Sequence, residues 1–284
     1  MRCLALLSSA RHLSNKVGNM SNPIICFDLD GTLFDPQGRI HPRDIAILTS
    51  ESEINFIIAT GRSLQSVRAM FTKNGLFTDV RIPFPLVLQN GSVIYEHNEK
   101  MAGYFPFTSD TQHQLIDIIQ NFPQISFYLF DVKETHLLWP TAFGLDSAER
   151  FAMQSRPYKN DGSNYNFSKI MCVSEDNVLL QKIAQIIQDL EVEISFSMET
   201  LLEITPQGID KASGLGQLLS LLNKSNANLF VAGDGENDLP LFDTAQYSFA
   251  PANSPEPVRV CADDIIDTSK HGLLTPILKK AGYL

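Results

Sequence analysis

The chain has 284 residues, of which 44% are hydrophobic and 19% charged, and its 22 basic and 32 acidic residues give a formal net charge of −10. This length corresponds to about two domains, and the composition excludes a disordered, collagenous or coiled-coil protein. Negative charge repels phosphate backbones and anionic lipids, and no apolar run approaches the roughly 18 residues of a membrane span. We therefore expect neither nucleic acid nor a membrane as partner, and the sequence gives no indication of the oligomeric state.

The first 21 residues differ from the rest of the chain. They include Arg2, Arg11 and Lys16 together with four leucines and four serines, and no acidic residue occurs before Asp28. This composition is typical of an organelle transit peptide, and it equally fits a disordered leader upstream of a second start at Met20. The sequence therefore predicts a protein of the cytoplasm, or of a mitochondrion or plastid if residues 1–21 are a transit peptide.

Short apolar segments that end in polar residues alternate with helical patterns after the leader. The expected strands are 24–27, 55–59 and 228–232, and helical periodicity begins at Leu64 and again after Lys211. Uniformly apolar strands alternating with helices indicate a parallel sheet covered on both faces, with ligands bound beyond the carboxyl ends of the strands. The fold class is therefore α/β.

The middle of the chain follows a different pattern. Strand-like stretches at 125–130 and 170–173 mix with two helical segments, and the strand-helix alternation resumes at Leu202. We therefore predict an α+β cap domain, 93–196, inserted into a core made of 22–92 and 197–284. Several of its aromatic residues are candidates either for stacking on a substrate or for the core of the cap: Tyr128, Trp139, Tyr158 and Tyr165.

Four carboxylates follow the expected strands. Asp28 and Asp30 are two residues apart at the end of the first strand, so their side chains can face the same side. Asp234 and Asp238 follow a later strand. If all four converge, their repulsion requires a cation, and hard oxygen ligands favour Mg²⁺. Any single one of them would otherwise be explained as a helix cap or a turn residue.

Three further segments offer groups that could bind an anion. Thr60 and Gly61 provide a hydroxyl and a backbone N–H at a helix start, and Asn237 provides an uncharged donor. Lys211 also begins a helix, where a positive charge is unfavourable for the helix dipole, which indicates a role towards an anion instead.

Segments 28–33, 59–62 and 233–238, together with Lys211, resemble in order and spacing the four motifs of the haloacid dehalogenase-like (HAD) superfamily. The long insert after the second motif, preceded by Gln89-Asn90-Gly91, resembles the Cof-type sugar-phosphatase branch. The resemblance extends over about 24–282 and implies a Rossmann-like parallel-sheet core with an α/β cap.

The resemblance also implies roles for individual residues. Asp28 would be the nucleophile that forms an aspartyl-phosphate, and Asp30 the general acid and base. Mg²⁺ would bind Asp28, the backbone carbonyl of Asp30, and Asp234, with Asp238 in support. The phosphoryl oxygens would be held by the backbone at Leu29 and by Thr60, Gly61, Lys211 and Asn237.

The resulting hypothesis is a Mg²⁺-dependent phosphatase that hydrolyses a small phosphorylated metabolite, a sugar phosphate or a similar compound. A sugar phosphomutase with the same nucleophile is one alternative, although the predicted cap has only two arginines, Arg150 and Arg156, for a second phosphate. A catalytically inactive module that binds a phosphometabolite is another. A dinucleotide-binding protein is disfavoured because the first strand lacks the Gly-x-Gly-x-x-Gly turn.

Overall fold

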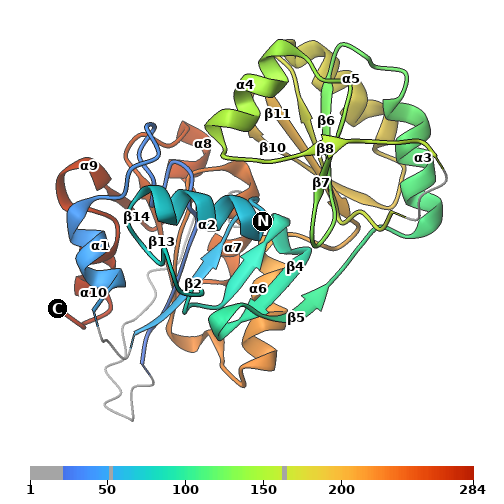
Figure 1. Cartoon of the computed structure of the whole chain (residues 1–284). Coiled ribbons are helices and arrows are strands. Elements are labelled where there is room, and N and C mark those ends of the chain that lie inside the picture. The colour runs from blue at the N-terminus through green and yellow to red at the C-terminus, as the bar shows by residue number, and fades with distance from the viewer. Residues whose placement is uncertain (1–21, 51–53, 162–164) are drawn as a thin grey trace.

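The computed structural model describes residues 22–50, 54–161 and 165–284. The leader, residues 1–21, and the targeting prediction attached to it lie outside these residues. Two sheets organise the described chain, and Figure 1 shows each with its own helices, in two bodies joined by chain crossings. Within the described ranges no helix is both long and apolar enough to cross a membrane.

The larger sheet has eight strands in the order β14-β13-β12-β1-β2-β3-β4-β5. The pairs from β14 to β3 are parallel, whereas β3-β4 and β4-β5 are antiparallel. Its strands are β1 (Ile24–Phe27), β2 (Asn55–Ala59), β3 (Leu86–Leu88), β4 (Val93–Glu96), β5 (Lys100–Tyr104), β12 (Leu229–Ala232), β13 (Tyr247–Pro251) and β14 (Asp264–Ile266).

Helices cover both faces of this sheet, as the apolar strands predict. In β1, Ile25 and Phe27 pack into one buried cluster, while Ile24 and Cys26 pack into the other. This division follows from the alternation of side chains along a strand. The first cluster is covered by α1 (Pro42–Leu48), α2 (Leu64–Lys73) and α10 (Leu274–Lys280), and the second by α6 (Lys211–Leu221), α7 (Leu239–Thr244) and α8 (Glu256–Arg259). A short helix, α9 (Thr268–His271), precedes α10.

The second body is the cap, whose six strands run in the order β10-β11-β9-β6-β7-β8. One face of this sheet packs against α3 and α5, and the other carries α4 and faces the core. The elements are α3 (Ser109–Ile119), β6 (Ser126–Phe130), β7 (Thr135–Leu138), α4 (Ala142–Arg150), β8 (Arg156–Pro157), β9 (Lys169–Val173), α5 (Asn177–Ile187), β10 (Val192–Met198) and β11 (Leu201–Pro206).

The predicted inserted domain exists, but its predicted boundaries at 93 and 197 are wrong. Strands β4 and β5 extend the core sheet by antiparallel pairing, so the chain enters the cap only after Tyr104. Strand β11 pairs with β9, and β10 pairs with β11 at the edge of the cap sheet, so the chain returns to the core only after Pro206. The strand at Leu202, predicted as the resumption of the core, is therefore the last strand of the cap.

Candidate active site

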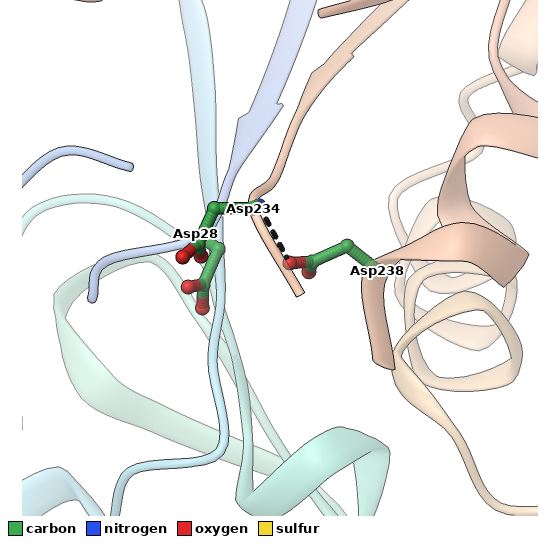
Figure 2. A group of neighbouring side chains, drawn as sticks. All are labelled: Asp28, Asp234 and Asp238. Carbon is green, nitrogen blue, oxygen red and sulfur yellow. Dashed lines mark hydrogen bonds between the residues drawn. The ribbon is translucent and has the colours of Figure 1, made fainter. Parts of the chain in front are cut away.

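Two acidic residues project from the carboxyl ends of neighbouring parallel strands. Asp28 follows β1 and Asp234 follows β12, and the backbone N–H of Asp28 donates to the carbonyl of Ala232 at 3.0 Å. Figure 2 shows the carboxylates of Asp28 and Asp234 side by side, with Asp238 beyond them. One oxygen from each of the three lies within 4.8 Å of the others. Three of the four carboxylates predicted to converge therefore do so, and Asp30 is not part of this group.

Gly31 makes the close approach of Asp234 sterically possible. Its φ is +72°, in the region that side chains with a Cβ rarely adopt, and a Cβ added there would lie 2.0 Å from Oδ2 of Asp234. The hydroxyl of Thr32 donates to Oδ1 of Asp234 at 3.3 Å. The turn after Asp28 therefore leaves room for the carboxylate of Asp234 because a glycine occupies position 31.

Lys211 is the cation nearest to these carboxylates. It is the first residue of α6, whose N-terminus is capped by Asp210, and it is 1% exposed. Its Nζ donates to Asp28 at 2.9 Å and to Asp238 at 2.7 Å. Burial alone lowers the pKa of Lys211, but the charges of Asp238 and Asp28 outweigh it and hold that pKa above its usual range. Lys211 therefore stays protonated beside the acidic cluster.

Asp238 differs from the other two carboxylates because both of its oxygens already accept hydrogen bonds. One accepts from Lys211, and the other accepts from the backbone N–H groups of Asp234 and Gly235 at 3.1 Å each. The dashed line in Figure 2 marks the bond from Asp234. This geometry favours Asp238 as the residue that orients Asp234 and Lys211.

The cluster carries more negative charge than Lys211 neutralises. Burial raises the pKa of Asp28 to about 7 even though Lys211 lowers it. Burial, together with the charges of Asp28 and Asp238, raises the pKa of Asp234 to about 8. Two carboxylates that resist ionisation would become fully charged if a divalent cation bound, and the donors are all oxygen atoms. The residues therefore fit Mg²⁺.

Asp30 lies outside this cluster and is bound by Arg62, a residue for which no role was predicted from the sequence. Both of its carboxylate oxygens accept from the guanidinium of Arg62, at 2.6 Å each. Arg62 also donates to the backbone carbonyl of Phe151 in the cap, which in addition accepts from the hydroxyl of Ser66 at 2.6 Å. Arg62 therefore connects Asp30 of the core to the cap.

The residues predicted to bind phosphoryl oxygens lie around one cavity between core and cap. Thr60, Gly61, Lys211 and Asn237 line it together with Asp28, Asp30 and Asp234, and its empty volume is about 630 Å³. Leu29 is fully buried with its side chain in the core cluster, so any contact with a phosphoryl oxygen falls to its backbone. Part of this space is open to solvent.

A buried ion pair of the cap lines the cavity and contacts the Thr60-Gly61 turn. Lys169 and Glu203 are 1% and 5% exposed, and they form a salt bridge with each other. Lys169 donates to the carbonyl of Gly61 at 2.7 Å, and Glu203 accepts from Asn90 at 3.1 Å. A Cβ at Gly61 would lie 3.0 Å from both charged groups, so glycine permits this contact. Neither residue was predicted from the sequence to take part in the site.

The aromatic residues proposed from the sequence do not reach the cavity. Tyr128 is buried and donates to the carbonyl of Gly144, while Tyr158 and Tyr165 pack against each other in the opposite face of the cap. Trp139 is 38% exposed, and of these four rings none lines the cavity. The rings that do line it are Phe130 and Phe151.

Comparisons with known proteins agree with this architecture. A family model for haloacid dehalogenase-like hydrolases matches residues 25–275. The chain is 23% identical over 248 residues to the 5-amino-6-(5-phospho-D-ribitylamino)uracil phosphatase YcsE of Bacillus subtilis, covering 87% of this chain and 90% of that one. SMU.1108c of Streptococcus mutans superposes with a TM-score of 0.79 at 21% identity, over 92% of this chain and all of that one. The HAD subclass IIB sugar phosphatase BT4131 superposes with a TM-score of 0.77 at 15% identity, over 93% and 100% of the two chains.

Proposed function

The chain belongs to the haloacid dehalogenase-like hydrolase family and is a phosphatase, and we propose that it hydrolyses a small phosphorylated metabolite with Asp28 as nucleophile and Mg²⁺ as cofactor. The observation that carries this proposal is the buried cluster in which Asp28 and Asp234 meet at a strand edge beside Lys211. An anionic phosphate ester can enter such a site only if further positive charge compensates the carboxylates.

Each residue has a distinct part in the proposed reaction. An oxygen of Asp28 attacks phosphorus and the ester oxygen leaves, so that an aspartyl-phosphate forms on Asp28. Asp30 would protonate the departing oxygen once one of its carboxylate oxygens leaves the Arg62 guanidinium. It would then take a proton from the water that attacks the aspartyl-phosphate and releases inorganic phosphate from Asp28. Lys211, the Thr60-Gly61 turn, Asn237 and the backbone of Leu29 hold the phosphoryl oxygens.

The carboxylates of Asp28 and Asp234, with the backbone carbonyl of Asp30, would hold Mg²⁺. When bound, the ion supplies positive charge that neutralises the phosphoryl oxygens. Asp238 supports this arrangement through its bonds to Lys211 and to the backbone of Asp234.

The cap favours hydrolysis over a phosphomutase reaction. A mutase binds two phosphate groups and needs cations for the second one. The arginines of the cap, residues 105–206, are Arg150 and Arg156, and neither lines the cavity. The cap lysine that does line it, Lys169, is already paired with Glu203. Arg156 instead pairs with Glu134 on the surface. We therefore assign water as the acceptor of the phosphoryl group. Because the cap closes over the cavity, we expect phosphorylated polypeptides to be excluded as substrates.

Phosphate release from a panel of small phosphate monoesters tests this proposal. We expect release with Mg²⁺, loss of release in excess EDTA, and recovery when Mg²⁺ is restored. Asp28→Asn is nearly isosteric but not nucleophilic, so it should abolish release, whereas Asp79→Asn on the exposed surface should not. Full activity of Asp28→Asn, or full activity in excess chelator, would contradict the proposal.

A further inference from the structure

The part of the cavity that lies in the cap has an apolar wall. Six side chains form this wall: Phe130, Phe151, Met153, Met171, Met198 and Leu201. Three of the chain's seven methionines are therefore gathered at one site. The phosphoryl-binding residues contribute none of these side chains, so this wall faces the leaving group of the ester.

Four of the six side chains lie on the cap sheet, whereas Phe151 and Met153 follow α4. Met171 lies two residues after Lys169 in β9, and Leu201 lies two residues before Glu203 in β11, so all four side chains share a face. Met171 is directly opposite Glu203 in the register of the two strands. The apolar wall thus begins next to the ion pair that contacts Gly61.

The charged groups beside this wall, Lys169 and Arg62, are already engaged within the protein, and Ser197 adds one hydroxyl to the lining. Lys169 is bonded to Glu203 and to the carbonyl of Gly61, and Arg62 is bonded to Asp30 and to the cap backbone. A sugar placed here would lose hydrogen bonds from its hydroxyls to water and gain contacts with carbon and sulfur. The wall therefore disfavours a polyhydroxylated leaving group.

A flat ring matches the same wall. Lys169 lies 5.3 Å above the ring of Phe130 and Arg62 lies 5.4 Å from the ring of Phe151, which fixes both rings beside the cavity. Phenylalanine rings pair favourably with other aromatic rings, and methionine thioethers contact ring edges while adapting to their shape. We propose that the preferred substrate is a phosphate monoester whose leaving group carries a flat, uncharged, largely apolar ring close to the ester oxygen. This inference rests on the proposed function and narrows its substrate class.

Benzyl phosphate and glucose 6-phosphate together test the inference. Both are phosphate esters of primary alcohols, so their leaving groups are alike at the reacting oxygen and differ in the group attached to it. We expect kcat/KM for benzyl phosphate to exceed that for glucose 6-phosphate by about tenfold or more. Met198→Gln, at a half-buried position, should lower this ratio about tenfold, and Met153→Gln is a second variant of the same kind. Met101→Gln, at a position 55% exposed on β5, should leave the ratio unchanged.

A binding measurement separates this inference from the proposed hydrolysis. Benzylphosphonate should bind the wild-type protein with Mg²⁺ at least about tenfold more tightly than methylphosphonate, because only the former carries the ring. Tighter binding of benzylphosphonate without turnover of either ester would support the ring preference and contradict the hydrolysis. Turnover with equal or greater preference for glucose 6-phosphate would overturn the ring preference and leave the hydrolysis standing.

Discussion

The ammonium group of Lys211 lies 2.9 Å from a carboxylate oxygen of Asp28. The same nitrogen lies 2.7 Å from Asp238, so the lysine is fixed at the base of the cavity before any substrate binds. A cation held in this way needs no reorganisation when a phosphoryl group arrives, which is the condition for strong electrostatic stabilisation. This arrangement also explains why a lysine occupies the otherwise unfavourable first position of α6.

Replacing Lys211 by methionine should therefore impair catalysis more than binding. We expect Lys211→Met to lower kcat by about 10²–10³-fold, the loss found when one preorganised donor is removed from an active site. Steady-state kinetics on any ester that the wild type hydrolyses measures this. Lys159→Met, which removes an exposed lysine from the cap, is the matched control. A kcat for Lys211→Met within a few-fold of the control would exclude a catalytic role of this lysine.

Arg62 should affect the chemical step through the position of Asp30. Lysine keeps the charge but cannot form the bidentate pair with Asp30, so we expect Arg62→Lys to lower kcat by about 10²-fold, with a smaller change in KM. Arg150 offers a matched control, since its guanidinium lies 5.7 Å from the same Phe151 ring but on the exposed surface. Equal effects of Arg62→Lys and Arg150→Lys would indicate that the pair with Asp30 has no catalytic importance.

The Lys169–Glu203 pair should contribute to stability in a pH-dependent way. Glu203→Gln leaves Lys169 buried without its carboxylate, and loss of one partner of a buried pair costs about 3–5 kcal/mol. Burial raises the pKa of Glu203, but the charge of Lys169 and the hydrogen bonds from Lys169 and Asn90 outweigh it, so the net pKa is lowered from 4.5. The ionised carboxylate therefore stabilises the fold above about pH 4.5, and this contribution is lost as the pH falls through the folded-state pKa.

Denaturant unfolding of the two proteins across pH measures this effect. The difference in unfolding free energy between wild type and Glu203→Gln should be large at pH 7. It should narrow as the pH falls from about 4.5, where the unfolded carboxylate takes up its proton, through the lower folded-state pKa. Glu149→Gln, on the exposed surface of α4, should differ little from wild type at any pH. A difference that stays constant down to acid pH would mean that the charge of Glu203 is not what stabilises the cap.

The family motifs were predictable from the sequence because they lie at the ends of strongly apolar strands. Parallel strands bring their carboxyl ends to one edge, so Asp28, Thr60 and Asp234 had to meet once those strands were identified. The boundaries of the cap were not predictable in this way. Alternating apolar residues indicate a strand but not the sheet it joins, and β4, β5 and β11 were each assigned to the wrong sheet.

The polar residues contributed by the cap were missed for a related reason. Lys169 and Glu203 each stand as a single charge at an otherwise apolar strand, and that signal was present in the sequence. A buried charge requires a partner, which would have linked the two, but only the register of β9 and β11 shows that they share a face. The cavity rings Phe130 and Phe151 gave no such signal, because an apolar side chain facing a ligand has the same pattern as one facing the core.

Trapping of the phosphoenzyme tests most directly whether the phosphoryl group is transferred to Asp28. Asp30→Asn removes both the acid that protonates the leaving group and the base that activates water. With an aryl phosphate, whose leaving group needs no acid, the aspartyl-phosphate should therefore accumulate when this variant is mixed with the ester and Mg²⁺ and quenched in acid. Peptide mass spectrometry should then find one phosphoryl group on Asp28, and none in the Asp28→Asn, Asp30→Asn double variant. A phosphoryl group on any other residue would contradict the account, as would substrate turnover by Asp28→Asn without a phosphoenzyme.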